Sequence, residues 1–384
     1  MTLHWIRRDH AVVSVSLAIG ILVTRLGHQN MTDELLIYGS YGYTGSLIAK
    51  TAVDEGESPV LAGRRAEAVE AQATEIGLDH RTFSLEHSTV IEQTVSDFDT
   101  VLNCAGPFSS TATPLIDACV ETGTNYLDIA GQIDVLESIA KRDDDAVESD
   151  ITLLPAVGFD VVPTDCLAVY LADRVESPAR LRLAIDGLAT FSPGTGKSII
   201  EGLRHPGTIR ENGTIRDVPA AWKTREFTFD GIQKKAVTVP WGDVSTAFYA
   251  TDVPNIETYA TVPEYALKIM KRSRRFTRAF GSKPVREASK TLIDHVVSGP
   301  TAAQREQNVT QIVGEVETDD GEQASAHLRT PDTYDLTAKT AVESARRVLN
   351  NEVETGFLTP GEAFGADYIL MFPGVERRDI DLPR

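Results

Sequence analysis

Three glycines follow the first strongly apolar segment of the chain at three-residue intervals. Residues 35–38 are typical of a buried parallel strand, and residues 46–50 begin a helical pattern. Glycines permit a tight turn in which backbone N–H groups approach a pyrophosphate at a helix N-terminus, where the helix dipole favours anions. A plain glycine turn is the alternative. The strand-to-helix context favours a dinucleotide-binding loop, and the predicted contacts are Gly39, Ser40, Tyr41, Gly42, Tyr43, Thr44 and Gly45.

Two arginines, Arg64 and Arg65, follow the second apolar segment at 59–62. NAD-binding domains usually have Asp or Glu here, which accepts hydrogen bonds from the ribose 2′-hydroxyl. A guanidinium instead binds phosphate through two parallel hydrogen bonds. The pair therefore indicates NADP, with Arg64 as the first candidate for the 2′-phosphate and Arg65 as the second. The alternative is that both arginines lie at a solvated helix start.

The elements that would position these residues form an alternating series. Further strands are predicted at 99–104, 126–131 and 151–156, with a helix at 113–122 that ends at Gly123. This alternation predicts a doubly wound parallel α/β sheet of the Rossmann type. Ligands bind at the carboxyl ends of such strands. The loop after the 99–104 strand therefore supplies four more predicted cofactor contacts: Asn103, Ala105, Gly106 and Pro107.

The second half of the chain has a different pattern. Residues 161–332 predict an inserted, mostly antiparallel α+β domain, and residues 333–350 predict an amphipathic helix. A hairpin turn is predicted at 319–321. The predicted strands of the insert are 178–190, 227–229, 236–239, 247–250, 256–262, 308–317 and 323–329. The predicted parts are an extension (1–30), an NADP domain (31–160), the inserted domain (161–332) and a C-terminal segment (333–384).

Composition limits the classes of function. The chain has 384 residues and a formal charge of −19, from 37 basic and 56 acidic residues. This length suggests two domains, and the acidic surface disfavours nucleic acid as a partner. The basic residues are mostly arginine, so we expect a halophilic protein, with an ordinary acidic enzyme as the alternative. Three cysteines without a CxxC pair, and histidines without metal-ligand spacing, predict a reducing, cytoplasmic location and no metal.

The first thirty residues differ from the rest. Arg7 and Arg8 precede an apolar run at 11–23, which is too short to span a bilayer of about 30 Å. The run also imitates a signal peptide, yet no convincing cleavage site follows. We favour Met31 as the biological start, because it leads directly into the first strand. A short membrane-associating extension is the alternative.

Several spaced motifs together resemble a known family. GSYGYTG (39–45), LAGRR (61–65), NCAGPF (103–108), GTNYLDIAG (123–131) and GFDVVPTD (158–165) resemble the saccharopine dehydrogenase-like oxidoreductases. The branch of trans-acting enoyl reductases, which act in complex-lipid and polyketide assembly, is the most similar. Two later segments, 193–198 and 356–361, extend the resemblance over about residues 33–372. The chain departs from the branch at Pro193 and Gly361, and at Gln132, where the branch usually has Glu.

The resemblance implies an NADP-dependent oxidoreductase that reduces an activated C=C bond in an isoprenoid or other lipid-like substrate. It also implies that residues 333–384 pack back onto the NADP domain. A saccharopine-type amino-acid dehydrogenase and a non-catalytic NADP-binding protein are the alternatives. Phe108, Thr195 and Ser198 are the predicted substrate-binding residues. Tyr126, Asp128 and Asp160 are the candidates for catalysis, although each could equally have a structural role.

One basic segment interrupts the acidic trend. Residues 268–278 combine lysines and arginines with apolar side chains, a pattern that favours peripheral contact with anionic lipid. The alternative is a helix whose apolar side chains cover its own core while its charges stay solvated. The protein could also act as a homodimer.

Overall fold

The computed structural model describes residues 33–188, 192–196, 207–273 and 299–380. The predictions for residues 1–30, Ser198 and residues 274–278 therefore lie outside the described residues. Among the described residues, no helix combines the length and apolar character that a membrane span requires.

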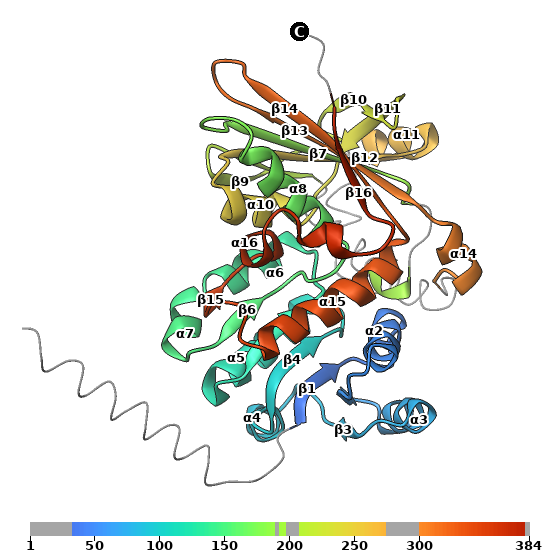
Figure 1. Ribbon diagram of the computed structural model, residues 1–384, viewed down its shortest axis with the longest axis vertical. Coiled ribbons are helices and arrows are strands. Elements are labelled where there is room, and N and C mark those ends of the chain that lie inside the picture. The colour runs from blue at the N-terminus through green and yellow to red at the C-terminus, as the bar shows by residue number, and fades with distance from the viewer. Residues whose placement is uncertain (1–32, 189–191, 197–206, 274–298, 381–384) are drawn as a thin grey trace, which may run out of the picture. The chain divides into compact units, whose positions relative to one another are not determined.

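The first sheet is parallel and seven-stranded, in the order β15-β6-β5-β4-β1-β2-β3 (Figure 1). Its strands are β1 (Asp33–Tyr38), β2 (Val60–Gly63), β3 (His80–Thr82), β4 (Phe98–Asn103), β5 (Asn125–Asp128), β6 (Thr152–Leu154) and β15 (Gly356–Phe357). Its helices are α2 (Tyr43–Asp54), α3 (Ala66–Ile76), α4 (Ser88–Val95), α5 (Phe108–Thr122), α6 (Ile133–Ala140), α7 (Asp143–Glu148) and α15 (Thr333–Leu349). The predicted doubly wound Rossmann sheet is confirmed.

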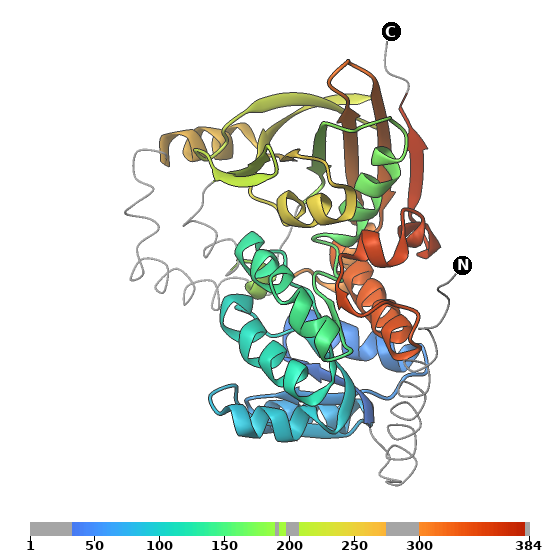
Figure 2. The ribbon, with the colours of Figure 1, turned by 90° about the vertical axis from the view of Figure 1, so that its left-hand side faces the viewer.

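Successive apolar residues of these strands enter two different cores. In β1, Leu36 packs with α4 and α5, whereas Ile37 packs with α2, α3 and α15. Adjacent strand residues point to opposite faces, so an uninterrupted apolar run requires a helical layer on each face. Figure 2 shows these helices on both sides of the sheet. The continuous apolar pattern of residues 35–38 is thereby explained.

The second sheet is mixed and nine-stranded, with the main order β10-β11-β12-β7-β13-β14-β16 and with β8 and β9 beside β12. Only the β7–β12 pair is parallel among the registers in this sheet. Its strands are β7 (Arg180–Asp186), β8 (Thr208–Glu211), β9 (Thr214–Asp217), β10 (Thr224–Phe229), β11 (Ile232–Thr238), β12 (Asn255–Thr261), β13 (Thr310–Glu317), β14 (Gln323–Thr330) and β16 (Glu376–Asp379). The inserted, mostly antiparallel second domain is confirmed.

Helices α8 (Val162–Ala172) and α10 (Asp243–Thr251) supply the core on one face of the second sheet. Leu167 and Leu171 of α8 pack there with Leu183 of β7 and Ile312 of β13. The short helix α16 (Pro360–Phe364) also lies against α8, as Figure 1 shows. The remaining described helices are α11 (Glu264–Ser273) and α14 (Ala302–Gln307), with a 3₁₀ turn at Tyr368–Met371.

Two predicted elements are wrong. Residues 247–250 are predicted in a strand and lie in α10, whose buried residues run continuously from Asp243 to Ala247. A short apolar run does not distinguish strand from helix by periodicity alone. The helix predicted at 113–122 begins five residues earlier, at Phe108, and contains Pro114 in its interior. Its predicted end at Gly123 is confirmed, because Gly123 has φ 72°.

The C-terminal segment returns to both sheets. Helix α15 packs against α2 and contributes Ala341 and Ala345 to the core beneath the first sheet. Strand β15 extends the first sheet beside β6, whereas β16 pairs with β14 of the second sheet. The segment therefore does not lie on the NADP domain alone.

A buried arginine connects the two domains. Arg210 of β8 is 4% exposed and donates to the Val244 and Gly213 carbonyls and to the Glu137 carboxylate of α6. Its guanidinium also lies 4.1 Å from the centre of the Phe248 ring. Ser245 donates a further hydrogen bond to Glu137 at 2.7 Å. The Arg210 guanidinium and the Glu137 carboxylate thus each have several hydrogen-bond partners.

Replacing Arg210 by methionine should lower the free energy of unfolding by about 3 kcal/mol, because Glu137 would keep its charge without a cationic partner. Urea unfolding measures this loss. Arg216→Met is the matched control, since Arg216 is 61% exposed in its pair with Glu211. That variant should lose less than about 1 kcal/mol. Equal losses in the two variants would show that the buried Arg210–Glu137 pair contributes no more to stability than an exposed ion pair.

Candidate cofactor and substrate site

The glycine loop after β1 is built on close backbone approaches. Gly39 has φ +84°, and a Cβ atom there would lie 2.7 Å from the backbone nitrogen of Ala105. A Cβ atom on Gly45 would lie 2.4 Å from the Gly39 carbonyl oxygen. Such distances exclude any side chain at either position without movement of the backbone. The spacing of these two glycines therefore brings the loops after β1 and β4 together at one edge of the sheet.

The N-terminus of α2 opens at this edge. Its N-cap residue, Gly42, is extended, no side chain caps the helix, and its first turn contains no acidic residue. The nearby Ser40 side chain is fully buried, and its hydroxyl oxygen has no hydrogen-bond partner. Uncapped N–H groups and the positive end of a helix dipole suit a pyrophosphate. The predicted contacts of residues 39–45 fit this group.

The two arginines after β2 have different surroundings. The Arg65 guanidinium lies 4.6 Å from the centre of the Tyr41 ring, in a cation–π contact. The Tyr41 ring in turn covers Gly63, where an added Cβ atom would lie 2.4 Å from the ring. Arg64 is exposed at the carboxyl end of the strand. This arrangement keeps Arg64 as the first candidate for a 2′-phosphate.

A buried polar network joins the loops after β4, β5 and β6. The Asn103 side-chain nitrogen donates to the Tyr126 hydroxyl at 3.1 Å, and its oxygen accepts from the Ala105 N–H at 3.0 Å. Tyr126 donates to Asp128 Oδ2 at 2.8 Å. Asp128 Oδ1 accepts from the Ala130 and Ala156 N–H groups, each at 2.9 Å. These contacts fix three loops relative to one another.

Tyr126 and Asp128 therefore have positions that a structural role explains. Both side chains are 0% exposed. Burial raises the pKa of Tyr126 well above its usual value, and it raises that of Asp128 despite the three hydrogen bonds that favour the carboxylate. The Asn103 side chain is likewise buried and turned inward. Only the neighbouring Ala105, Gly106 and Pro107 reach the surface of the predicted cofactor loop.

Asp160 differs from the other two catalytic candidates. It follows β6 in the loop before α8, and the residue as a whole is exposed. Desolvation of the carboxyl among the surrounding residues raises its pKa to about 6. Trp241 donates its indole N–H to the Asp160 carbonyl, and a Cβ atom on Gly131 would lie 2.9 Å from Asp160 Oδ2. Asp160 is thus an accessible acid with a raised pKa at the carboxyl end of the sheet.

Thr195 lies in a cluster of hydroxyl groups. Its Oγ1 atom is 3.0 Å from the Tyr334 hydroxyl and 3.2 Å from Ser192 Oγ. The Ser192 N–H donates to the Tyr334 hydroxyl at 2.5 Å. The Tyr334 ring meets Tyr43 of the nucleotide loop edge to face, with ring centres 5.0 Å apart. Burial raises the pKa of Tyr334, and the charge of Asp160 also raises it.

Tyr334 is the residue of this cluster that the sequence did not reveal. In the sequence it is one apolar position on the face of the 333–350 helix, and nothing in that pattern distinguishes its hydroxyl. Phe108 was predicted to bind substrate, but it is 7% exposed and belongs to the core with Ala112 and Leu115. An aromatic side chain at the start of an amphipathic helix is more easily buried than exposed.

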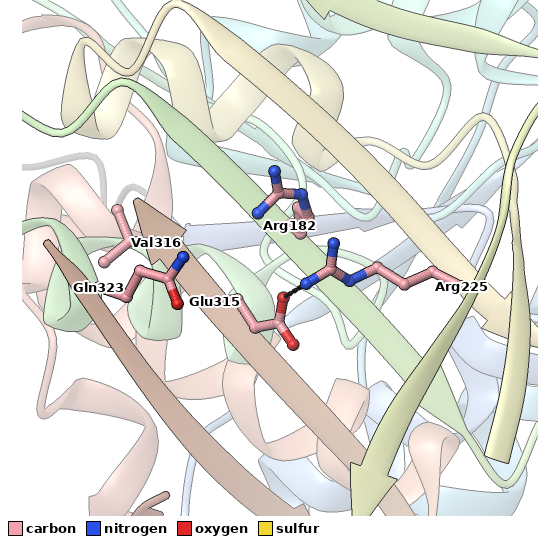
Figure 3. Close-up of a pocket in the computed structure, with 5 residues that line it drawn as sticks. All are labelled: Arg182, Arg225, Glu315, Val316 and Gln323. Atoms are coloured by element: carbon pink, nitrogen blue, oxygen red, sulfur yellow. Dashed lines mark hydrogen bonds and ion pairs between the residues drawn. The ribbon is translucent and has the colours of Figure 1, made fainter. Parts of the chain in front are cut away.

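Figure 3 shows a separate small hollow on the second sheet, lined by Arg182, Arg225, Glu315, Val316 and Gln323. Its volume of about 40 Å³ has room for little more than water. Arg225 donates to Glu315 at 2.7 Å, and Arg182 donates to Glu317 at 2.9 Å. None of the predicted site residues lines it, so it is not part of the candidate site.

The parallel sheet, the glycine loop and the arginine after β2 define a dinucleotide-binding Rossmann domain. A family model described as the saccharopine dehydrogenase NADP-binding domain matches residues 35–154. Residues 35–154 therefore match the NADP-binding domain of the saccharopine dehydrogenase family. The predicted family and the predicted cofactor, NADP, are confirmed at this level.

Curated relatives are similar to part of this chain. The chain is 27% identical over 223 residues to the saccharopine dehydrogenase-like oxidoreductase of Bos taurus, covering 50% of this chain and 51% of the relative. It is 29% identical over 150 residues to the trans-acting enoyl reductase of Mycobacterium leprae, covering 37% and 36% of the two chains. The match thus spans about half the length of the bovine relative.

Apo saccharopine dehydrogenase (L-Glu forming) from Saccharomyces cerevisiae has the same fold, with a TM-score of 0.59 at 12% identity. The alignment covers 91% of this chain and 100% of the yeast chain. The likeness therefore includes the second domain as well as the NADP domain.

Replacing Arg64 by alanine should raise the Kd for NADPH about 10- to 100-fold and leave the Kd for NADH nearly unchanged, because only NADPH carries a 2′-phosphate. Fluorescence titration of the reduced cofactors measures both constants. Arg65→Ala is the matched control and should have a smaller selective effect, since Arg65 stacks on Tyr41. Equal loss of affinity for both cofactors would exclude Arg64 as the 2′-phosphate ligand.

Proposed function

We propose that this protein is an NADPH-dependent reductase of an activated C=C bond in a lipid-like or isoprenoid substrate. The observation that carries the proposal is Asp160, an accessible acid with a pKa of about 6 at the edge that also holds the nucleotide loop. The similarity to the Mycobacterium leprae trans-acting enoyl reductase supports the choice of C=C reduction.

Reduction of a C=C bond beside a carbonyl adds a hydride to one carbon and a proton to the other. Bound NADPH supplies the hydride. The loop at 39–45 and Arg64 hold the cofactor, and the Thr195–Tyr334 hydroxyl cluster orients the carbonyl oxygen by hydrogen bonding. Asp160 gives its proton to the second carbon and is reprotonated from solvent, because the residue is exposed.

The pairing of three arginines on the second sheet favours a hydrophobic substrate over an amino acid. A saccharopine-type reaction needs cations for the α-carboxylates of its substrates. Arg182, Arg210 and Arg225 are each paired with a glutamate of this chain. A non-catalytic NADP-binding protein is the remaining alternative. That alternative predicts tight NADPH binding without oxidation of NADPH by either class of substrate.

The basic helix α11 suits delivery of such a substrate from a membrane. It carries Lys268, Lys271 and Arg272 toward its C-terminal end, and Tyr265 near its start is 69% exposed. We propose peripheral contact with anionic lipid through this helix. The chain should co-sediment with anionic vesicles at low salt, and the triple change of these basic residues to glutamine should abolish it. Absence of binding by the unaltered chain would exclude the contact. A homodimer remains a prediction.

Enoyl thioesters of lipid-like acyl chains should be reduced with oxidation of NADPH, whereas lysine plus 2-oxoglutarate should give no turnover. Loss of NADPH absorbance measures both reactions. The rate should fall as the pH rises above about 6, because Asp160 must carry its proton to act as an acid. Asp160→Asn should lower kcat about 100-fold or more and remove this pH dependence, without changing NADPH affinity.

Asp319→Asn serves as the control, since Asp319 lies in the exposed β13–β14 turn with 80% of its side chain accessible. Turnover with lysine plus 2-oxoglutarate alone would overturn the proposed reaction. An unchanged pH profile in Asp160→Asn would instead exclude Asp160 as the proton donor.

A further inference from the structure

Two carboxyl groups are enclosed where α8, α10 and α16 meet. Asp165 of α8 and Asp243 at the start of α10 are each 0% exposed. The Gly361 N–H of α16 donates to Asp165 Oδ2 at 2.7 Å. Asp165 Oδ1, both carboxyl oxygens of Asp243 and the hydroxyl of Thr246 are buried without a hydrogen bond of ordinary geometry. The hydroxyls of Thr359 and Thr246 face Asp165 and that of Thr164 faces Asp243, and each partly opposes the rise in pKa that burial causes in the carboxyl that it faces. Figure 1 shows the three helices side by side between the two sheets.

The charges around this pair do not neutralise it. Within the described residues, neither carboxyl forms an ion pair with a basic side chain. Burial raises the pKa of the neighbouring Cys166 thiol, and Arg377 of β16 only partly opposes this rise. Arg377 is itself paired with Asp367, and Arg210 is paired with Glu137. The other titratable groups that face the pair are acids or thiols, from the loop before α8, from α8 and from α16: Asp160, Cys166 and Glu362.

Two adjacent buried carboxylates without a counter-ion lower the stability of the folded protein. An ionised carboxylate moved into protein costs several kcal/mol, and a second one beside it adds repulsion. A neutral carboxyl avoids both costs and also becomes a hydrogen-bond donor to an acceptor oxygen. Asp165 Oδ1 and both carboxyl oxygens of Asp243 are such acceptors, so one proton bound by the pair would remove a buried charge and add a donor to the threonine hydroxyls already present.

We propose that Asp165 and Asp243 together bind one proton in the folded protein at neutral pH, and that this proton stabilises the junction of α8, α10 and α16. The pKa values of both carboxyls are raised, as a bound proton requires. Burial raises the pKa of Asp165 to about 6. Burial also raises the pKa of Asp243 well above its usual value, and the charges of Asp165 and Asp160 add to the rise. The proton belongs to the pair rather than to either residue alone.

The consequence for stability has a definite sign. The unfolded chain loses this proton near the ordinary Asp pKa of about 4, whereas the folded chain keeps it to higher pH. Stability from the proton is therefore complete below that pH and is lost as the pH rises toward the value at which the folded pair ionises. Over this interval the ratio of unfolded to folded protein should rise about tenfold per pH unit for one proton.

The test is urea unfolding of the full chain between about pH 5 and pH 9, at fixed ionic strength, in potassium and in choline buffers. The unaltered protein should show the predicted one-proton slope in both buffers. Asp243→Asn keeps the shape and supplies a permanent donor, so it should remove most of the slope and be more stable than the unaltered chain at about pH 9. Asp165→Asn is the second variant and should also reduce the slope.

The exposed Asp319→Asn should leave the slope unchanged. Stability that does not depend on pH would overturn the proposal, as would an unchanged slope in both asparagine variants. Stabilisation by potassium but not by choline, lost in Asp243→Asn, would also overturn it, because a cation would then occupy the site in place of the proton.

Discussion

Asp128 is the residue on which the arrangement of the site depends. Its carboxylate accepts hydrogen bonds from Tyr126 and from the backbone after β5 and β6. Tyr126 in turn accepts from Asn103, which holds the loop after β4. Parallel strands end at one edge, but their loops diverge unless polar groups join them. This buried network keeps the cofactor loop, the Gly131 turn and the Asp160 loop at fixed separations.

The first sheet could be predicted from the sequence because its signals are local. Residues 35–38 and the pair Val101–Leu102 place apolar side chains in the cores on both faces of the sheet, and a loop with a glycine follows each strand. The second domain was less predictable at residues 247–250, since a four-residue run fits a strand and a helix equally well. The return of β16 to the second sheet depends on contacts between distant segments, which no local pattern encodes.

In the candidate site, too, some features could be predicted from the sequence and others could not. The glycines and arginines were predictable, because a close backbone approach requires glycine and a phosphate favours arginine. Side-chain direction was not. Asp128 and Asp160 are both aspartates at strand ends, yet the first is enclosed and the second is accessible. Tyr334 joins the hydroxyl cluster across more than a hundred residues of chain, so its partners are visible only in the folded molecule.

The path of the C-terminal segment has a consequence for how the protein can be divided. Residues 33–160 contain the whole cofactor loop, but the core around Leu102 of β4 and Leu127 of β5 would lose Ala341 and Val342 of α15. Likewise, a fragment that ends before residue 376 would leave β14 as an unpaired edge. Neither domain corresponds to one continuous stretch of gene, so truncation cannot separate them cleanly. Fusion partners and insertions are better tolerated at exposed turns such as 319–321.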